Sequence, residues 1–408
     1  MPERLDSAVE PRLDLDPFSD EFLSEPYPYH ERIREAGPVV WLERYELWAT
    51  ARFEQVHATL RDWETFCSSA GVGLSDFRKE APWRPPSIIL EADPPEHTRA
   101  RAVLTRVLSV RAIEVLRETF QQEAERLVGA LVAGDQGAKH GVRFDAIESL
   151  AQAFPLKVFA DAVGLPADGR ENLLAYGNMV FNALGPRNRL FDDAMAQAEP
   201  VREWIAHHCS REILSETGLG AQIYQAADDG ELTQDEAALL VRSLLSAGLD
   251  TTVIALGNAI YCFATHPEQW QRLREDPGLA RSAFDEGLRL ESPAQTFFRT
   301  TTRRVNLAGA DLPAHAKILL FLGAANRDPR RWEDPEKFDI ERKVAGHVGL
   351  GSGIHACVGQ SLARLEAECL LGALARHVAA IELDGEPVRR LHNTLRGFDV
   401  LPVALTPA

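Results

Sequence analysis

The chain has 408 residues, of which 45% are hydrophobic, and this is enough apolar material for a substantial buried core. The 61 acidic residues outnumber the 44 basic ones and give a net charge of −17, which disfavours binding to nucleic acid and to anionic membrane surfaces. Five cysteines without a CxxC pair fit neither a disulfide framework nor a structural zinc site, so reduced thiols in a cytoplasm are expected.

The sequence has no linker, repeat or low-complexity tract that would divide it, so a single domain over residues 1–408 is expected. The N-terminal stretch MPERLDSAVEPRLDLDPFSDEF lacks the apolar run of a signal peptide or a membrane anchor. Patches typical of strands occur at about residues 40–60 and 299–325, and most of the remaining chain shows helical periodicity. The predicted fold class is mainly α with small β-sheets.

Two helices can be placed in the first two thirds of the chain from the residues at their ends. Asp93 is a candidate N-cap for a helix over about residues 94–108, because prolines that suit a first helical turn follow it. Thr233 and Glu236 form a capping-box pattern for a second helix that ends before Pro267. This second helix would be about 31 residues or roughly 46 Å long, and it should cross the core because it is apolar nearly all round.

The middle of the long helix carries residues that weaken helices by flexibility or by competing for backbone hydrogen bonds. They are Ser243, Ser246, Gly248, Asp250, Thr251 and Thr252. A local opening is expected there, since functional sites use such strain. An acid beside an alcohol is suited to proton relay, with Asp250 supplying protons and Thr251 holding the oxygen and its water. The alternative is a threonine bonded to the preceding turn and an aspartate placed by chance.

A third helix is expected from Pro277 to just before Pro293, and a fourth begins at or just after Cys357. A cysteine at a helix start lies where partial positive charge and free N–H groups stabilise a thiolate. The glycines of GLGSGIHACVG let the backbone approach a flat group closely, so a thiolate bound to a bulky prosthetic group is indicated. A buried structural thiol, a phosphate loop and a nucleophile pair with His355 remain open as alternatives.

Cationic side chains surround this stretch of sequence and a predicted helix. A haem carries two propionates, and burying them requires cationic hydrogen-bond donors. His97 and Arg101 stand at positions i and i+4 of one helical face, Arg299 lies in a strand pattern, and His355 precedes Cys357 by two residues. Each of them alone fits a surface group or a satisfied core residue, but together they predict a propionate clamp.

These motifs resemble those of the cytochrome P450 monooxygenases, and the similarity covers essentially the whole chain. GLGSGIHACVG resembles the haem loop of that family, AGLDTT resembles its oxygen-activation motif, and EGLR resembles its buried pair, here Glu286 and Arg289. Leu350 replaces the phenylalanine that usually begins the loop, and Lys337 stands where an arginine commonly completes the pair. The resemblance implies one triangular-prism-like domain around a buried heme b (iron protoporphyrin IX) whose iron is bound by Cys357.

More narrowly, the chain is similar to soluble bacterial members that oxidise para-substituted benzoates, notably by O-demethylation of 4-methoxybenzoate. The similar stretches include PWRPPSIILEADPPEHTR, LLVRSLLSAGLDTT and ESPAQTFFRTTTR. The positions that this subgroup uses around the benzoate carboxylate are here Arg84, Ser87, Arg242, Ser243 and Ser246. Its ring and haem-side pocket positions are here Phe181, Leu184 in place of an expected phenylalanine, Ala247 and Phe297.

The spacing of residues along the long helix is compatible with such a substrate. Ser243, Ser246, Ala247, Asp250 and Thr251 follow i, i+3, i+4, i+7 and i+8 and would share one face. The rise from Ser246 to Thr251 is about 7.5 Å, comparable to the span from a carboxylate to a para substituent. The alternative is that the serines simply bond carbonyls one turn back.

The resemblance implies an enzyme that uses O2 to convert 4-methoxybenzoate to 4-hydroxybenzoate and formaldehyde. Oxidation of another small aromatic, or a non-catalytic haem-thiolate sensor, are the alternatives. No reductase domain is recognised, so electrons are expected from another protein, and the resemblance implies a small, acidic 2Fe-2S ferredoxin and a flavoprotein reductase. Basic residues on the thiolate side are expected to form a ferredoxin-docking patch. They are Arg99, Arg106, Arg342, Lys343 and Arg364.

Overall fold

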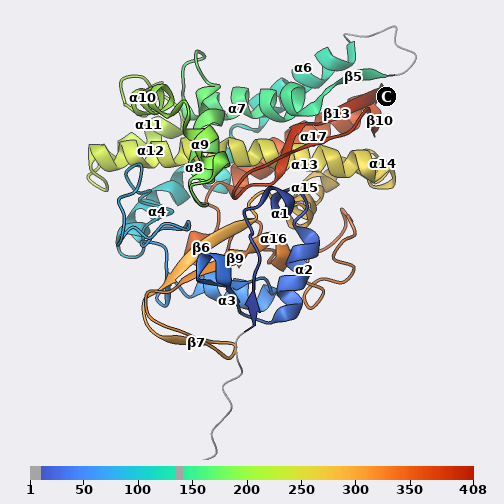
Figure 1. Cartoon of the computed structure of the whole chain (residues 1–408). Helices are drawn as coiled ribbons and strands as arrows, with labels where there is room; N and C mark the ends of the chain where they lie inside the picture. The colour runs from blue at the N-terminus through green and yellow to red at the C-terminus, as the bar shows by residue number, and fades with distance from the viewer. Residues whose placement is uncertain (1–10, 134–140) are drawn as a thin grey trace, which may run out of the picture.

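Helices dominate the computed structural model, which describes residues 11–133 and 141–408. Figure 1 shows α12 and α13 end to end across the middle of the molecule, with further helices above them and the largest sheet below. The prediction about the N-terminal stretch falls partly on residues 1–10, which lie outside the described residues.

The α-helices are α1 (Asp20–Ser24), α2 (Tyr27–Ala36), α3 (Phe53–Arg61), α4 (Glu96–Val107), α5 (Val110–Glu114), α6 (Arg117–Ala133), α7 (Ala153–Val163), α8 (Asn172–Asn182), α9 (Arg189–Met195), α10 (Ala198–His208), α11 (Leu219–Asp228), α12 (Gln234–Gly248), α13 (Asp250–Thr265), α14 (Pro267–Glu275), α15 (Ala280–Leu290), α16 (Leu322–Ala325) and α17 (Gln360–His377). A π-helix covers Ile147–Gln152, directly before α7. Short 3-10 helices cover Glu43–Tyr45, Pro277–Leu279 and Gly353–His355.

The strands form one larger sheet and three small ones. The strands are β1 (Arg12–Leu13), β2 (Val40–Leu42), β3 (Leu47–Thr50), β4 (Phe66–Cys67), β5 (Val142–Asp145), β6 (Thr296–Thr301), β7 (Val305–Leu307), β8 (Ala310–Leu312), β9 (Lys317–Phe321), β10 (Val378–Leu383), β11 (Val388–Arg390), β12 (Gly397–Val400) and β13 (Pro402–Pro407). The largest sheet has the order β1-β2-β3-β9-β6-β4, and the others are β10-β13-β5, β11-β12 and β7-β8. Both predicted strand regions are therefore confirmed, whereas the C-terminal strands were not predicted.

The long central helix has the predicted ends but is interrupted. Its capping box is present, since Thr233 Oγ1 accepts from Glu236 N at 3.1 Å and Thr233 N donates to Glu236 Oε2 at 2.8 Å. Helix α13 ends before Pro267, which begins α14. Leu249, with φ −98° and ψ −65°, stays in the right-handed helical region of the backbone but belongs to neither helix, and it separates α12 from α13. One continuous helix is therefore wrong, while the predicted local opening is confirmed.

The pair α12–α13 is also the most membrane-like segment of the described chain. The stretch Gln234–Thr265 is long and apolar enough to cross a membrane by length and composition alone. In the protein, 67% of its most apolar window is buried against other elements, as in the core helix of a globular fold.

The helix predicted at residues 94–108 begins slightly later, at Glu96, and Asp93 does not cap it. The carboxylate of Asp93 instead accepts hydrogen bonds from the backbone N–H groups of Ser68 and Ser69, both at 3.0 Å. The predicted N-cap role is wrong because these two distant amides already use the oxygens that a cap would need.

The later two helices agree with their sequence signals. Pro277 opens a 3-10 turn that leads into α15, and α15 ends at Leu290, before Pro293. Helix α17 begins at Gln360, shortly after Cys357, with Gly359 at its N-cap. The expectation that the cysteine immediately precedes a long helix is confirmed.

His30 on α2 gives the fold a specific pH dependence. Its side chain is 1% exposed among the rings of Phe22 and Phe321, and neither ring nitrogen has a hydrogen-bond partner in the described part of the chain. Burial lowers the pKa of His30 well below its ordinary value of 6.5. Below pH 6.5 the unfolded chain therefore binds a proton that the folded chain refuses, and stability falls as the pH falls.

Substituting His30→Phe should remove this term, which is about 1.4 kcal/mol per pH unit below the ordinary pKa. The free energy of unfolding, measured by denaturant titration from pH 7 to pH 5, should fall less steeply for the variant than for the wild type. The exposed His207→Gln change on α10 is the control and should keep the wild-type slope. Equal slopes for wild type and H30F would contradict the prediction.

Candidate active site

Cys357 ends a glycine-rich loop that is folded tightly back on itself. Its N–H donates to Leu350 O at 2.8 Å, which fixes the cysteine against the start of the loop. Gly351 and Gly353 both have φ 69°, a left-handed conformation that favours glycine. A Cβ atom on Gly353 would also lie 2.7 Å from Leu60 O. The loop path therefore depends on glycine at these positions, and it presents the sulfur ahead of α17.

The environment of the Cys357 sulfur differs from that of the other cysteines. Of the five cysteines, all in the described residues, Cys357 is the one that is not fully buried. Burial nevertheless raises the pKa of its thiol, and the Gly359 N–H and the Arg101 guanidinium oppose that rise. The predicted helix-start effect is present but smaller than the burial effect. A cation bound to the sulfur would hold a thiolate here, as metals do with coordinating thiols.

Two of the four predicted clamp residues lie directly against each other. The rings of His97, on α4, and His355, before the cysteine, are 4.5 Å apart between centroids. Both Nε2 atoms are buried and lack hydrogen-bond partners in the residues that the structure describes. His355 Nδ1 donates to Ile89 O at 3.2 Å, so Nε2 becomes a second donor when the ring is protonated. A bound carboxylate would favour that protonated form.

The other two clamp residues anchor neighbouring elements. Arg101 Nη1 donates to Ala356 O at 2.6 Å and so joins α4 to the cysteine loop. Arg299 on β6 is 4% exposed, and burial lowers its pKa to about 10. Asp93 lies near this group, with its Oδ1 3.9 Å from His355 Nε2. Burial raises the pKa of Asp93, but its interactions with His355 and Ser69 outweigh this and hold it below the ordinary value.

The donor set fits the prosthetic group that the sequence implies. The two propionates of a haem require buried cationic or hydrogen-bond-donating partners. Buried imidazole nitrogens without partners and a buried guanidinium can serve as these partners. Within residues 11–133 and 141–408 no group of three or more His, Cys, Asp or Glu residues is arranged to hold a metal ion. With Cys357 as the ligand to its iron, the group that these residues fit is a haem.

Two residues beside the break between α12 and α13 have accessible side chains. Ala247 is exposed and Thr251 is half-buried, whereas residues 252–260 are buried throughout. Thr251 Oγ1 donates to Ala247 O at 2.7 Å, which is the backbone bond expected under the structural alternative. Since this bond uses the hydroxyl hydrogen, the lone pairs of the Thr251 oxygen remain able to accept a hydrogen bond from a ligand.

Asp250, the first residue of α13, is 1% exposed and carries an ion pair that was not predicted. Its Oδ1 accepts from Arg390 Nη1 at 3.0 Å, and Arg390 comes from β11. The Oδ2 atom of Asp250 has no hydrogen-bond partner among the described residues. The strained helix region therefore holds a buried carboxylate with one paired and one free oxygen.

Three of the predicted ring-pocket residues meet in one apolar cluster. Phe181 and Leu184, at and just after the end of α8, pack with Phe297 on β6. The cluster also contains Val72, Ile254 and Leu395, which were not predicted because they come from three distant segments. Leu184 is fixed by its backbone, since its carbonyl accepts from Leu74 N at 2.8 Å. Ala247 is outside this cluster.

Two of the predicted serines form a buried pair. Ser87 and Ser243 are 5% and 7% exposed, and their Oγ atoms are 2.9 Å apart. Ser243 Oγ donates to Leu239 O at 2.9 Å, so the Ser87 hydroxyl is the donor within the pair. Ser246 Oγ donates to Ser243 O at 3.1 Å. The expected alternative, hydroxyls bonded to the preceding turn, is confirmed for Ser243 and Ser246.

Of the two arginines predicted around a substrate carboxylate, one is paired with a carboxylate of the protein and the other is not. Arg84 Nη1 and Nη2 donate to the two oxygens of Glu91 at 3.0 and 3.4 Å. Glu91 was not predicted, and it also accepts from Ser87 N at 2.7 Å. Arg242 Nη2 donates to the carbonyl of Pro85 at 2.7 Å, and no carboxylate pairs with Arg242 in the described chain. Its positive charge is therefore the one left for an acidic ligand.

The predicted structural pair is present, but its third member is a different residue. Glu286 and Arg289 are both fully buried and bonded by Nε–Oε2 at 2.7 Å and Nη2–Oε1 at 2.8 Å. Arg342 completes the group, with Nε 3.1 Å from Glu286 Oε1. Lys337 contributes only its backbone carbonyl, which accepts from Arg289 at 3.2 Å. Lys337 is therefore not the third member of the group, because Arg342 reaches the same carboxylate from further along the chain.

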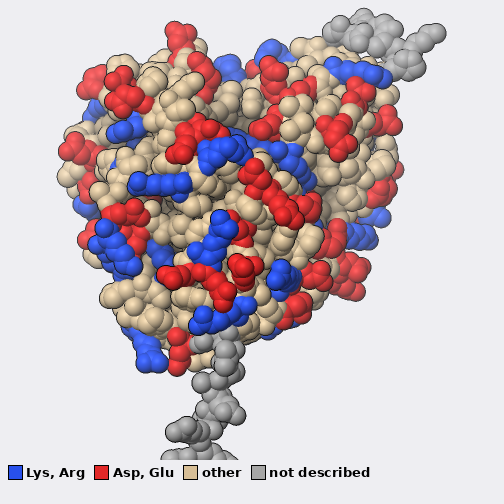
Figure 2. Space-filling view, in the orientation of Figure 1, with Lys and Arg blue, Asp and Glu red and all other residues tan. Residues whose placement is uncertain are grey.

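The predicted docking patch is largely neutralised within the protein itself. Arg342 belongs to the buried group just described, and its side chain is only 14% exposed, so its place in the patch is wrong. Arg364 pairs with Asp285 at 2.8 Å, Arg106 with Glu231 at 2.6 Å, and Arg99 with Glu236. Figure 2 shows one face of the molecule, over which basic and acidic side chains are interspersed.

Comparisons with known proteins agree with this geometry. A family model for cytochrome P450 matches residues 206–277 and 278–395. Cytochrome p450 CYP199A2 of Rhodopseudomonas palustris is 56% identical over 398 residues, which cover 98% of this chain and 95% of that protein. The cytochrome P450 monooxygenase PikC of Streptomyces venezuelae is 33% identical, with 97% of this chain and 95% of PikC covered.

A solved structure shares the fold over nearly its full length. Cytochrome P450 CREJ in complex with (4-ethylphenyl) dihydrogen phosphate superposes with a TM-score of 0.85 at 26% identity, covering 96% of this chain and 99% of that one. Together with the Cys357 loop, the buried cationic groups and the Glu286–Arg289 pair, these similarities show that the chain belongs to the cytochrome P450 family of haem-binding monooxygenases.

Proposed function

We propose that this P450 removes the methyl group of 4-methoxybenzoate and related para-substituted benzoates. The observation that carries the proposal is the buried hydroxyl pair of Ser87 and Ser243. Leu90, whose N–H donates to Ser87 Oγ at 3.2 Å, packs against the apolar cluster of Phe181, Leu184 and Phe297. Polar donors and an apolar pocket are thus adjacent, as a small aromatic acid requires.

The carboxylate end is supported by the hydrogen-bond donors at this place. The Ser87 hydroxyl can turn from Ser243 to a carboxylate oxygen by rotation about one bond, and Arg242 supplies a positive charge without a carboxylate partner in the described residues. Arg84 is less suited to this task because Glu91 already balances its charge. The CREJ structure was solved with a para-substituted aryl phosphate, so this fold accommodates a para-substituted aromatic with an acidic group.

Cys357 would bind the haem iron, and His97, Arg101, Arg299 and His355 would hold the propionates. When bound, the haem supplies oxygen activation, which electron donation from a thiolate ligand favours. The overall reaction consumes O2, two electrons and two protons, and yields 4-hydroxybenzoate, formaldehyde and water.

The chain's own residues bind, orient and supply protons. The serine pair fixes the acid end and the apolar cluster excludes water from the ring, so that the para substituent is held in one orientation. Asp250 supplies protons, and the Thr251 oxygen accepts a hydrogen bond beside the reacting group. The electrons come from a separate 2Fe-2S ferredoxin and a flavoprotein reductase in the cytoplasm, by analogy with similar bacterial members of the family.

Replacing Ser87 and Ser243 together by alanine should weaken 4-methoxybenzoate binding about tenfold, since a buried carboxylate loses its neutral donors. The measurement is the dissociation constant from the substrate-induced change in the visible spectrum. 4-Methoxytoluene, which lacks the acid, should bind both proteins equally. The variant Ser210→Ala, at a half-buried position far along the chain from Ser87 and Ser243 where the hydroxyl donates to His207 O, is the control.

Unchanged affinity for the acid in the double variant would refute the role of the serine pair. The wider proposal fails if the protein, supplied with a reconstituted electron chain, forms no product from any para-substituted benzoate.

A further inference from the structure

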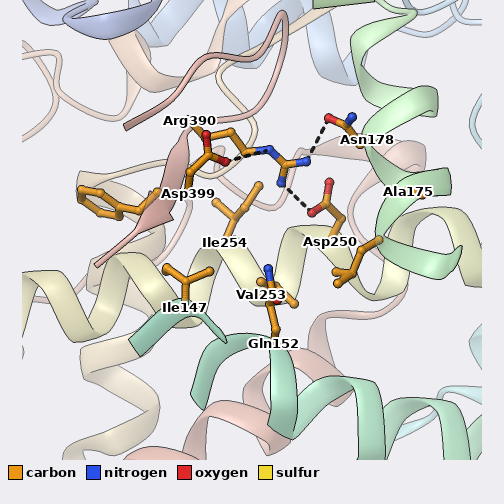
Figure 3. A pocket seen from close by; sticks show the side chains of 11 residues that line it. Ile147, Gln152, Ala175, Asn178, Asp250, Val253, Ile254, Arg390 and Asp399 are labelled. Atoms are coloured by element: carbon orange, nitrogen blue, oxygen red, sulfur yellow. Dashed lines mark hydrogen bonds and ion pairs between the residues drawn. The ribbon is translucent and has the colours of Figure 1, made fainter. Parts of the chain in front are cut away.

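A cavity of about 220 Å³ lies between the π-helix Ile147–Gln152, α8, α13 and the strands β11 and β12. Figure 3 shows its lining side chains, with Arg390 between Asp250 and Asp399. Among the described residues these three are the charged ones that line it, and its other polar side chains are Gln152 and Asn178. The cavity therefore joins the buried acid of the proposed mechanism to a second carboxylate.

The inner end of the cavity is formed by Asp250. Its Oδ1 is bound by Arg390, and its buried Oδ2 has no partner in the described residues. Helix α8 packs closely on this side chain, since a Cβ atom on Gly177 would lie 2.7 Å from Asp250 Cβ. This packing, which also reaches the Oδ2 atom, and the ion pair at Oδ1 hold the carboxylate in one position, and Oδ2 is the oxygen without a hydrogen-bond partner among the described residues.

Arg390 fixes this arrangement as a positioning residue. Its Nη1 donates to Asp250 Oδ1 at 3.0 Å and its Nη2 donates to Asn178 Oδ1 at 2.9 Å. Its Nε lies 3.8 Å from Asp399 Oδ1 on β12. The planar guanidinium of Arg390 contacts all three residues, so the carboxylates of Asp250 and Asp399 lie on different sides of the same positive charge.

The outer end of the cavity is formed by Asp399. Its side chain is 57% exposed, so the cavity reaches bulk solvent at this residue. Partial burial raises the pKa of Asp399 above its ordinary value; the Arg390 charge lowers it and the Asp250 charge raises it further. The polar side chains that the π-helix and α8 contribute to the lining are the uncharged Gln152 and Asn178, and their other lining residues are apolar. Asp399 is thus in contact with solvent and lines the same cavity as Asp250.

We propose that Asp399 collects protons from solvent and delivers them through water in this cavity to Oδ2 of Asp250. In each transfer the Asp399 carboxyl gives up one proton, the Asp250 carboxylate gains one, and Asp399 is reprotonated from solvent, so no electrons move. A cavity of this volume accommodates several waters with polar partners. The inference rests on the proposed function, in which Asp250 supplies the protons of the reaction.

The test compares Asp399→Asn with Glu386→Gln in the substrate-bound holoenzyme with a reconstituted electron chain. Glu386 is an exposed carboxylate in the turn between β10 and β11, so its variant removes the same surface charge away from the cavity. D399N should turn over about three- to tenfold more slowly, with a larger solvent deuterium isotope effect and less product per electron pair. Substrate affinity should be unchanged in D399N, and E386Q should behave as the wild type.

A second measurement does not depend on turnover. Infrared titration of the holoenzyme should show a protonated-carboxyl band that is absent in D399N and present in E386Q. Equal isotope effects and product yields in D399N and E386Q would overturn the inference.

Asp250→Asn distinguishes a failure of the proton inlet at Asp399 from a failure of the proposed role of Asp250. If D250N is slow and D399N matches E386Q, the inlet at Asp399 is wrong and the proposed role of Asp250 stands. If D250N turns over like the wild type, both are wrong.

Discussion

Replacing Cys357 by alanine is expected to abolish both the thiolate–haem spectrum and monooxygenase turnover. The Cys357 sulfur is the thiolate ligand that the glycine-rich loop would offer to a haem iron, and the loop is held in place independently of it by Leu350 O and the Arg101–Ala356 contact. An alanine there leaves the backbone unchanged while it removes the ligand. The readouts are the visible spectrum of the reduced carbon monoxide complex and product formation from 4-methoxybenzoate.

Cys369→Ala is the matched control for this experiment. Cys369 lies on α17, the helix that follows Cys357, and it is 2% exposed. Its loss leaves only a small cavity, so the spectrum should remain that of the wild type. An unaltered spectrum in C357A would show that another residue binds the iron.

Replacing Glu286 by glutamine should lower the free energy of unfolding by about 3–5 kcal/mol, because it leaves buried arginine charge without its carboxylate. Arg289 would keep the carbonyls of Asn326, Pro335 and Lys337, but the glutamine would offer Arg289 and Arg342 one neutral oxygen in place of two charged ones. Denaturant unfolding of the wild type and the variant at the same pH measures this difference.

Two further variants test whether this loss of stability is specific to the buried Glu286 carboxylate. Asp228→Asn removes a surface partner of Arg211, a pair whose side chains are 52% and 33% exposed, and should cost at most about 1 kcal/mol. Lys337→Ala should be nearly neutral because only the Lys337 carbonyl enters the network. If E286Q is no less stable than D228N, the buried pair stabilises the fold no more than a surface ion pair does.

The features that the sequence predicted well are encoded within a few residues. The capping box of Thr233 and Glu236, the Glu286–Arg289 pair and the loop of Cys357 each occupy one turn or one loop. Their geometry follows from backbone rules that a short stretch obeys in most contexts. The break at Leu249 belongs to the same class, since hydroxyl and glycine residues on both sides of it signalled a weak helix.

The features that sequence reasoning missed depend on residues far apart in the chain. Arg390 meets Asp250 across 140 positions, and Arg84 is balanced by Glu91 through a loop without regular structure. Nothing in a local pattern shows which carboxylate an arginine will reach. The same limit explains why Arg342 was expected at the surface and is instead found against Glu286.

The ion pairs on α4 have a consequence for the association with an electron donor. Arg99 pairs with Glu236 and Arg106 with Glu231, so both arginines already cross-link α4 to the region where α12 begins. An acidic protein that engaged them would exchange one carboxylate for another and gain little attraction in total. Arg99 and Arg106 should therefore contribute little electrostatic attraction to complex formation, and replacing them should change the dependence of its rate on ionic strength only slightly.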